Sequence, residues 1–289
     1  MSNKIEPTAI EAELAARIDP WLTHMRWRPN FERWREQRIH QEAFQREPIA
    51  LLQAGLRLAE RGDDLAGLQL FDVGCGMGGF AVAVAQAGAH VTALDYHSDY
   101  CAITRLRAAR YGLDLRVFSA AGEAVPLPSG SFAAATCWDV LEHVQAPDAL
   151  LGELARILQP GGVLIITAIN RFAFRDPHYH LPLINWLPRP LAELLIDLAG
   201  RRKGGAFRDR QRLSEMHYYT WGGLERLAER HGFRVVDLDE ARVARGEVGG
   251  RQRWRRILAH SPLALPIYRL YRMLWQGTWR VVMVKGEGN

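Results

Sequence analysis

The residues with the clearest potential for chemistry are a glycine-rich turn and two carboxylates. Asp72 precedes Gly74 and Gly76, and a second acid, Asp95, ends the apolar segment at residues 90–95. Glycine accepts positive φ angles and lets a ligand approach the backbone closely. A carboxylate accepts hydrogen bonds from two hydroxyls at once. Residue types in this order are typical of a nucleoside-binding βαβ unit.

Three elements must position this turn. The apolar run at residues 68–73 predicts a buried parallel strand that stops at the glycines. Residues 80–87, rich in alanine and valine, predict a helix, and residues 90–95 predict a second strand that carries Asp95 at its end. A purely structural strand-to-helix turn is the alternative.

The stretch Asp-Val-Gly-Cys-Gly-Met-Gly at 72–78 resembles the first motif of class I S-adenosylmethionine-dependent methyltransferases. The resemblance implies that Gly74 and Gly76 line the methionine end of S-adenosylmethionine. It also implies that Asp95 binds the ribose hydroxyls of this cofactor. The predicted cofactor site also includes the flanking residues Asp72 and Tyr96.

The segment 120–128 resembles the loop that holds the adenine in these methyltransferases. In many relatives an aspartate just before the position of Gly122 accepts a hydrogen bond from the adenine amino group. This chain has Ala121 there, so the usual acid is missing. We expect Gly122 and Glu123 to contact the adenine edge instead.

Residues 135–144 closely resemble the fourth-strand motif of the ubiquinone-pathway O-methyltransferases, in the methyltransferase type 11 group. The stretch Ala-Ile-Asn-Arg at 168–171 is also similar to these enzymes. By position, Trp138 would stack on or lie under the cofactor. The resemblance covers about residues 68–171 well and residues 218–238 loosely.

Asp139, Glu142 and His143 are the predicted catalytic residues. Their offsets of 0, 3 and 4 predict a common face on one helical turn. Some quinol methyltransferases carry a divalent metal at the matching acid, acid and histidine, where Mg²⁺ would acidify a catechol-like hydroxyl. A general-base or substrate-orienting role for His143 and a purely structural role stay open. We therefore assign no residue to a metal from the sequence.

The whole chain fits one large α/β domain with additions. Its 289 residues are 48% hydrophobic and 24% charged, which allows a substantial core. Strands alternating with helices predict a Rossmann-like, doubly wound, mostly parallel sheet. The resemblance implies seven strands, the last lying antiparallel between the fifth and sixth. We expect a helical cap at 1–62 and a methyltransferase domain at 63–289, with insertions at about 172–217 and 242–277.

The N-terminal segment contains two features of interest. Residues 5–18 predict a helix that Asp19-Pro20 ends. Residues 21–44 mix tryptophans with arginines. This mixture predicts either a cap that covers the cofactor site or builds the substrate pocket, or an amphipathic helix packed on the core.

The N-terminus has no apolar signal core, and no apolar run is long enough to span a bilayer. We expect a cytoplasmic protein, with its three cysteines reduced.

The second insertion predicts contact with a membrane surface. Four arginines at 251, 253, 255 and 256 surround Trp254 and precede an apolar stretch at 262–275. This pattern suits an amphipathic segment lying on an anionic bilayer from the inner face. A helical pair packed over the sheet edge is an equal alternative. Nucleic acid is disfavoured, because the chain contains no RNA-binding module.

These observations predict a methyltransferase that uses S-adenosylmethionine. The favoured reaction is O-methylation of a small, amphiphilic, quinol- or phenol-like acceptor. One alternative is an NAD-type oxidoreductase, against which the Glu-His-Val and Pro-Gly-Gly signals argue. The other is a degenerate methyltransferase-fold binding protein at a membrane, which Ala121 would suit.

Overall fold

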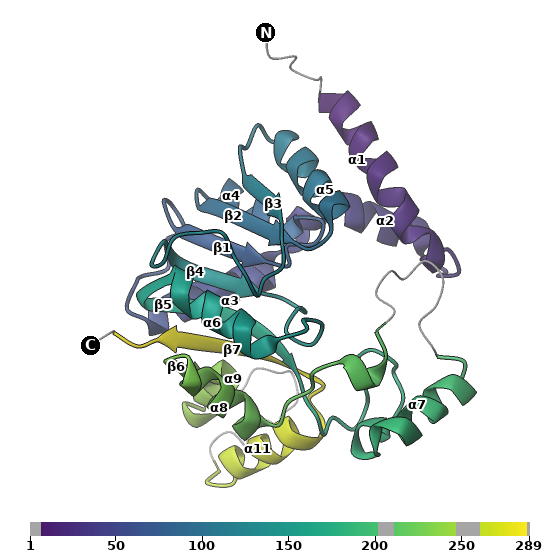
Figure 1. Ribbon diagram of the computed structural model, residues 1–289, viewed down its shortest axis with the longest axis vertical. Coiled ribbons are helices and arrows are strands. Elements are labelled where there is room, and N and C mark those ends of the chain that lie inside the picture. Colours follow the sequence, from purple (N-terminus) through teal and green to yellow (C-terminus); the bar gives the residue numbers. More distant parts are fainter. Residues whose placement is uncertain (1–6, 202–210, 247–260, 288–289) are drawn as a thin grey trace.

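The computed structural model describes residues 7–201, 211–246 and 261–287. Seven strands form one sheet in the order β3-β2-β1-β4-β5-β7-β6 (Figure 1). All neighbouring pairs from β3 to β5 are parallel, and β7 runs antiparallel to both β5 and β6. The predicted Rossmann-like fold is therefore confirmed. The strands are β1 Gln69–Val73, β2 His90–Asp95, β3 Arg116–Ser119, β4 Phe132–Cys137, β5 Leu158–Ile169, β6 Phe233–Val236 and β7 Thr278–Lys285.

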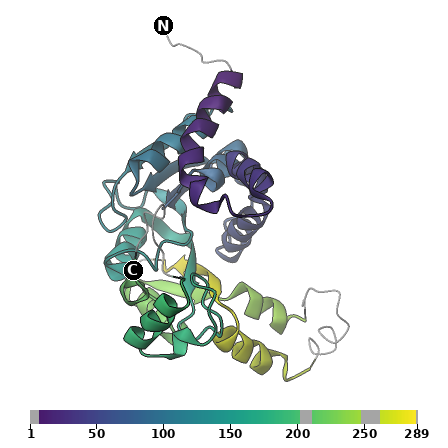
Figure 2. The ribbon, with the colours of Figure 1, turned by 90° about the vertical axis from the view of Figure 1, so that its right-hand side faces the viewer.

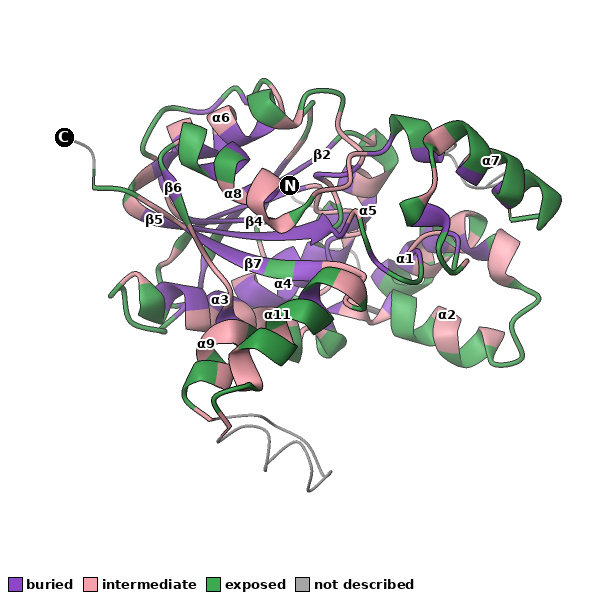
Figure 3. Cartoon of the chain, turned by 90° about the horizontal axis from the view of Figure 1, so that it is seen from below, coloured by how far each residue is buried: buried purple, intermediate pink, exposed green. Residues whose placement is uncertain are grey.

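Helices cover both faces of the sheet, as Figure 3 shows with the sheet seen near its edge. Alternate residues of β5 face opposite sides, so that Leu164 packs toward α6 and α8 whereas Ile165 packs toward α3 and α4. The helices are α1 Pro7–Leu22, α2 Phe31–Ile39, α3 Arg46–Leu58, α4 Gly79–Gln86, α5 Ser98–Ala109, α6 Pro147–Ile157, α7 Arg189–Leu198, α8 Trp221–Arg230, α9 Leu238–Ala244 and α11 Ala264–Leu274. Among the described helices, none is both long and apolar enough to cross a membrane.

An N-terminal cap, residues 7–45, packs against α5 at the end of the molecule opposite α7 and α11 (Figures 1 and 2). Leu14 and Ile18 of α1 are fully buried in a cluster with Ile103 of α5. The predicted end of the first helix at Asp19-Pro20 is wrong, because α1 continues to Leu22. Proline removes one helical hydrogen bond, and burial of Leu22 in the same cluster offsets that loss.

A buried ion pair joins this cap to the core. Arg107 of α5 has no exposed side-chain surface and pairs with Glu42 at 2.5 Å. Its guanidinium also donates to the carbonyls of Ile39 at 2.6 Å and Met77 at 2.8 Å. Met77 belongs to the glycine-rich turn, so a single side chain holds both the cap and the turn. Burial opposes ionisation of Glu42, but the Tyr111 hydroxyl and Arg107 outweigh it and leave its pKa below the usual value.

We predict that Glu42→Gln lowers the free energy of unfolding by about 3–5 kcal/mol, because it leaves a buried guanidinium without its countercharge. The matched control is Glu13→Gln, which breaks the exposed pair between Glu13 and Arg17. That change should cost at most about 0.5 kcal/mol. Urea unfolding followed by circular dichroism measures both variants. Equal losses in the two would contradict a special role for the buried pair.

Candidate cofactor and catalytic site

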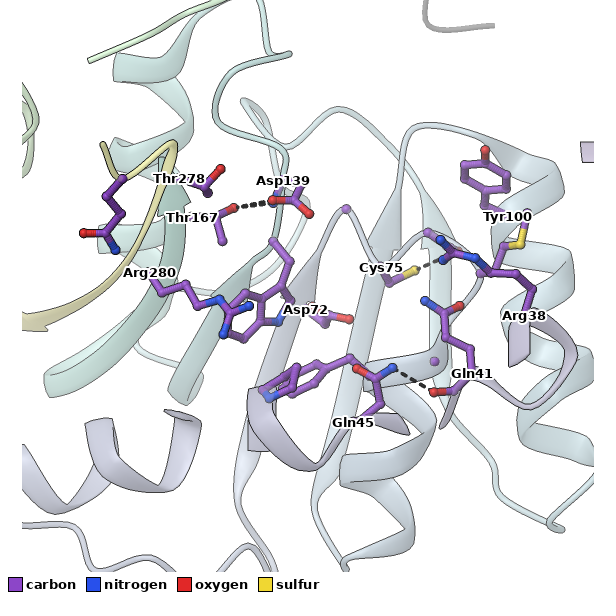
Figure 4. Close-up of a pocket in the computed structure, with 18 of the residues that line it drawn as sticks. Arg38, Gln41, Gln45, Asp72, Cys75, Tyr100, Asp139, Thr167, Thr278 and Arg280 are labelled. Carbon is purple, nitrogen blue, oxygen red and sulfur yellow. Dashed lines mark hydrogen bonds between the residues drawn. The ribbon is translucent and has the colours of Figure 1, made fainter. Parts of the chain in front are cut away.

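A cavity of about 770 Å³ lies where the carboxyl ends of the central strands meet the N-terminal cap (Figure 4). Ligands of doubly wound sheets bind at this edge. The strand ends and the turns after them contribute Asp72, Gly74, Gly76, Trp138, Asp139 and Thr167. The cap contributes Arg38, Gln41 and Gln45, and the C-terminal side contributes Gln276, Thr278 and Arg280. The predicted cap over the site therefore has side chains in the cavity wall.

The glycine-rich turn is closely packed except at one position. A Cβ at Gly74 would lie 2.1 Å from Val140, and one at Gly79 would lie 2.5 Å from Gln41 of the cap. Gly76 has a φ of +54°, and no atom lies within 4 Å of its would-be Cβ. The turn thus leaves open backbone at Gly76, where a ligand can approach.

Asp95 lies beside this turn, as the sequence predicted. Its side chain is buried, and its two oxygens accept hydrogen bonds from the backbone N–H groups of Gly76 and His97, both at 2.8 Å. Burial raises the pKa of Asp95, and these two hydrogen bonds oppose that rise. The carboxylate therefore orients the turn through Gly76, which lines the cavity, although Asp95 itself is not part of the cavity wall that the described residues form.

Asp72 lies beneath the turn and is 1% exposed. The Thr136 hydroxyl donates to it at 2.7 Å. Burial raises the pKa of Asp72 to about 7, and the charge of Asp95 adds to that rise. A cation bound in the cavity would favour the ionised form of Asp72.

Three residues predicted for the cofactor site, Tyr96 beside the ribose acid and Gly122 and Glu123 at the adenine edge, lie away from the cavity. Tyr96 is 74% exposed. A Cβ at Gly122 would lie 2.8 Å from Leu150, and Glu123 accepts a hydrogen bond from the backbone N–H of Gln145 at 3.1 Å. None of the three belongs to the cavity wall that the described residues form. Their predicted contacts with the cofactor stay predictions.

Trp138 and Asp139 follow β4 directly and face the cavity. Trp138 packs edge-on against Phe80, with ring centroids 5.6 Å apart. Asp139 has a φ of +53°, an unusual value for a residue other than glycine. Thr167 of β5 holds Asp139 by accepting from its backbone N–H at 2.5 Å and donating to its carboxylate at 3.1 Å. Figure 4 shows this pair at the cavity wall.

The predicted common helical face for Asp139, Glu142 and His143 is wrong. Residues 141–143 form a turn, and α6 begins only at Pro147. The left-handed conformation of Asp139 redirects the chain, so Glu142 enters the interior rather than the cavity wall. Burial and the charge of Glu142 both raise the pKa of Asp139.

Glu142 lies instead between two histidines. Its Oε1 is 3.8 Å from Nε2 of His143 and 3.7 Å from Nε2 of His178. His178 belongs to the first insertion, at about 172–217. No local pattern in the sequence links it to Glu142, because the two residues meet only through the tertiary fold.

Sequence reasoning also missed Thr167 and the two cap glutamines in the cavity wall. Thr167 lies inside β5, two positions before its end. A search for polar residues that follow a strand therefore does not find it. Gln41 and Gln45 are four residues apart. In a helical segment this spacing places two side chains on the same face, which could have indicated that they act together. Gln45 donates to the Gln41 carbonyl at 2.8 Å.

Comparison with known proteins agrees with this geometry. Residues 71–166 match the family model of the methyltransferase domain. Ubiquinone biosynthesis O-methyltransferase of Xanthomonas oryzae pv. oryzae is 41% identical over 110 residues, which are 37% of this chain and 46% of the relative. The same enzyme of Xanthomonas euvesicatoria pv. vesicatoria is 38% identical over 126 residues, 43% of this chain and 50% of the relative. The chain thus matches about half the length of these curated relatives.

Two solved structures share the fold. Magnesium protoporphyrin IX methyltransferase from Synechocystis PCC 6803, with bound S-adenosylhomocysteine, aligns with a TM-score of 0.51 at 16% identity over 94% of both chains. An S-adenosylmethionine-dependent methyltransferase from Mesorhizobium loti aligns with a TM-score of 0.51 at 19% identity, over 81% of this chain and all of that one. Residues 71–166 of the chain are therefore similar to a methyltransferase domain, and the fold is shared with solved S-adenosylmethionine-dependent methyltransferases.

Proposed function

We propose that the protein is an S-adenosylmethionine-dependent O-methyltransferase that acts on a small, amphiphilic, quinol- or phenol-like hydroxyl. The observation that carries this proposal is Asp139, held by Thr167 at the wall of the cavity beside Trp138. The partial match to ubiquinone-pathway O-methyltransferases supports a hydroxyl as acceptor.

The cofactor would lie over the glycine-rich turn, with its ribose near Asp95 and its methionine end over Gly76. When bound, it supplies a methyl group on a positively charged sulfonium. Asp72 beneath the turn then offers a compensating negative charge. The cap side chains Gln41 and Gln45 would close the cavity and exclude water, which favours in-line methyl transfer.

Asp139 is the proposed general base. Its pKa lies above the usual value because it is buried and because Glu142 lies near it. A carboxylate with a raised pKa accepts a proton from a phenolic hydroxyl more readily. In this scheme Glu142 tunes the base through its charge. His143 lies outside the cavity wall that the described residues form, and a positive charge on it would lower the pKa of Asp139.

We predict that Asp95→Asn weakens binding of S-adenosylhomocysteine by about 10- to 150-fold, because one charge-assisted hydrogen bond contributes about 1.5–3 kcal/mol. Isothermal titration calorimetry measures the affinity, and thermal melting checks the fold. The control is Asp114→Asn, which changes an exposed acid in the connection before β3. Unchanged affinity in Asp95→Asn would remove this residue from the cofactor site.

We predict that Asp139→Asn slows methyl transfer to catechol-type acceptors by about 10²–10⁴-fold, the usual contribution of a general base. Binding of S-adenosylhomocysteine should stay within about twofold, since the base acts on the acceptor. Transfer from methyl-labelled cofactor to catechols, with anilines alongside, measures both rate and acceptor class. Transfer to anilines alone would exclude O-methylation. Cofactor binding without any transfer would favour the degenerate binding protein.

A membrane surface is the proposed source of an amphiphilic acceptor. The helix α11 turns its polar side inward, where Arg272 pairs with Asp237 at 2.8 Å and with Glu240 at 2.7 Å. Its apolar side faces solvent, with Ile267 and Leu270 about half exposed. Exposed leucines of α7 lie at the same end of the molecule (Figures 1 and 2). The arginine cluster at 251–256 lies outside the described residues.

An amphipathic helix with its apolar side outward suits shallow insertion into a bilayer interface. We predict that the protein co-sediments with anionic vesicles at low salt and less so at high salt. Replacing both Ile267 and Leu270 by glutamine should reduce the bound fraction severalfold. Leu58→Gln, on α3, is the control and should leave it unchanged. Equal binding by both variants would show that α11 is not the contact.

A further inference from the structure

We propose that Glu142, His143 and His178 form a site for one divalent transition-metal ion. One ligating atom from each residue lies within 4.8 Å of the other two. Four-coordinate zinc, with bonds of about 2.0–2.1 Å, places its ligand atoms roughly 3.3 Å apart. The observed separations of 3.7 and 3.8 Å from Glu142 require only a small contraction. The site is independent of which acceptor the enzyme methylates.

The burial of Glu142 is the second observation that points to a cation. Its side chain is 1% exposed, and its Oε2 atom is buried without a hydrogen-bond partner within the described part of the chain. Burying a carboxylate oxygen without a partner is costly. A metal ion bound to this carboxylate would supply the missing interaction.

The imidazole of His143 is oriented for metal binding by Gln211. The Gln211 side chain donates from its amide nitrogen to the His143 carbonyl at 2.7 Å, which directs its amide oxygen at Nδ1 of the same residue, also at 2.7 Å. His143 therefore donates from Nδ1, and Nε2, which lies 3.8 Å from Oε1 of Glu142, is the atom that would bind the metal. A hydrogen bond of this kind behind a histidine is typical of metal ligands.

His178 is held by a separate set of contacts. Asp176 accepts from the His178 backbone N–H at 2.9 Å and from the Tyr218 hydroxyl at 2.9 Å. The rings of His178 and Tyr218 lie at an angle of 26°, with centroids 6.2 Å apart. These contacts come from the first insertion and the segment before α8. A metal would therefore tie the insertion to the turn after β4.

The donor set indicates which metal to expect. Two imidazoles and one carboxylate suit Zn²⁺, Mn²⁺, Co²⁺ or Fe²⁺ better than Mg²⁺, which prefers oxygen ligands. The set also differs from the acid, acid and histidine of metal-bearing quinol methyltransferases. Asp139, the first acid of that series, is engaged by Thr167 instead. His178 takes its place in this chain.

The test uses the full chain stripped of metal with EDTA and titrated with Co²⁺, Zn²⁺ and Mg²⁺. We expect one equivalent of Co²⁺ to bind with a visible absorption typical of nitrogen ligation, one equivalent of Zn²⁺ to displace it, and Mg²⁺ not to compete. Metal binding should also raise the melting temperature. Absence of stoichiometric Co²⁺ and Zn²⁺ binding would overturn the proposal.

Three variants distinguish the proposed metal ligands from the acid, acid and histidine set of the quinol methyltransferases. His178→Gln should weaken Co²⁺ binding at least tenfold while leaving S-adenosylhomocysteine affinity unchanged, which confirms the fold. His180→Gln changes an exposed histidine in the same insertion and should bind Co²⁺ like the unaltered protein. Asp139→Asn should also retain Co²⁺ affinity. Loss of Co²⁺ binding in Asp139→Asn, with retention in His178→Gln, would replace the proposed set with the acid, acid and histidine set.

Discussion

The buried ion pair between Arg107 and Glu42 is the interaction on which the geometry of the site depends. Arg107 reaches the cap through Glu42 and the Ile39 carbonyl, and reaches the glycine-rich turn through the Met77 carbonyl. Removing two charges from water is costly, and here several hydrogen bonds offset that cost. Because one guanidinium binds both segments, the position of the cap relative to the turn is determined. The cap glutamines consequently lie in the cavity wall.

The opposite wall of the cavity is held by the β-sheet itself. Thr167 of β5 binds Asp139, which follows β4, and Thr136 of β4 binds Asp72, which lies in β1. Each carboxylate is therefore fixed by a hydroxyl from the neighbouring strand. Adjacent parallel strands keep these side chains in register, so the chemistry rests on rigid elements. The cap and insertions then shape access to the cavity.

Much of the fold could be predicted from local sequence patterns. Three features lie close together in the sequence: the apolar strand, the glycine-rich turn and Asp95. The apolar run predicts a buried strand, the glycines predict a turn, and the acid predicts a hydrogen-bond acceptor. Asp95 accordingly ends β2 as expected, and it lies against Gly76. The antiparallel last strand between the fifth and sixth followed from the resemblance and is confirmed.

Other features depend on contacts between distant residues. Arg107 and Glu42 are 65 positions apart, and nothing local marks them as partners. The positive φ of Asp139 cannot be read from its side chain, and it removes the helical face expected for residues 139–143. The apolar periodicity of α11 predicted an amphipathic helix. It did not predict that the buried pair of Arg272 with Asp237 would turn its apolar side outward.

Hydrogen–deuterium exchange with and without S-adenosylhomocysteine tests the central claim most directly, namely that the glycine-rich turn and the cap together enclose the cofactor. The account predicts slower exchange on binding in residues 74–79, in residues 95–97 and in residues 39–45 of the cap. NAD at the same concentration should change none of these segments. Protection of the turn without the cap, or equal protection by NAD, would contradict the account.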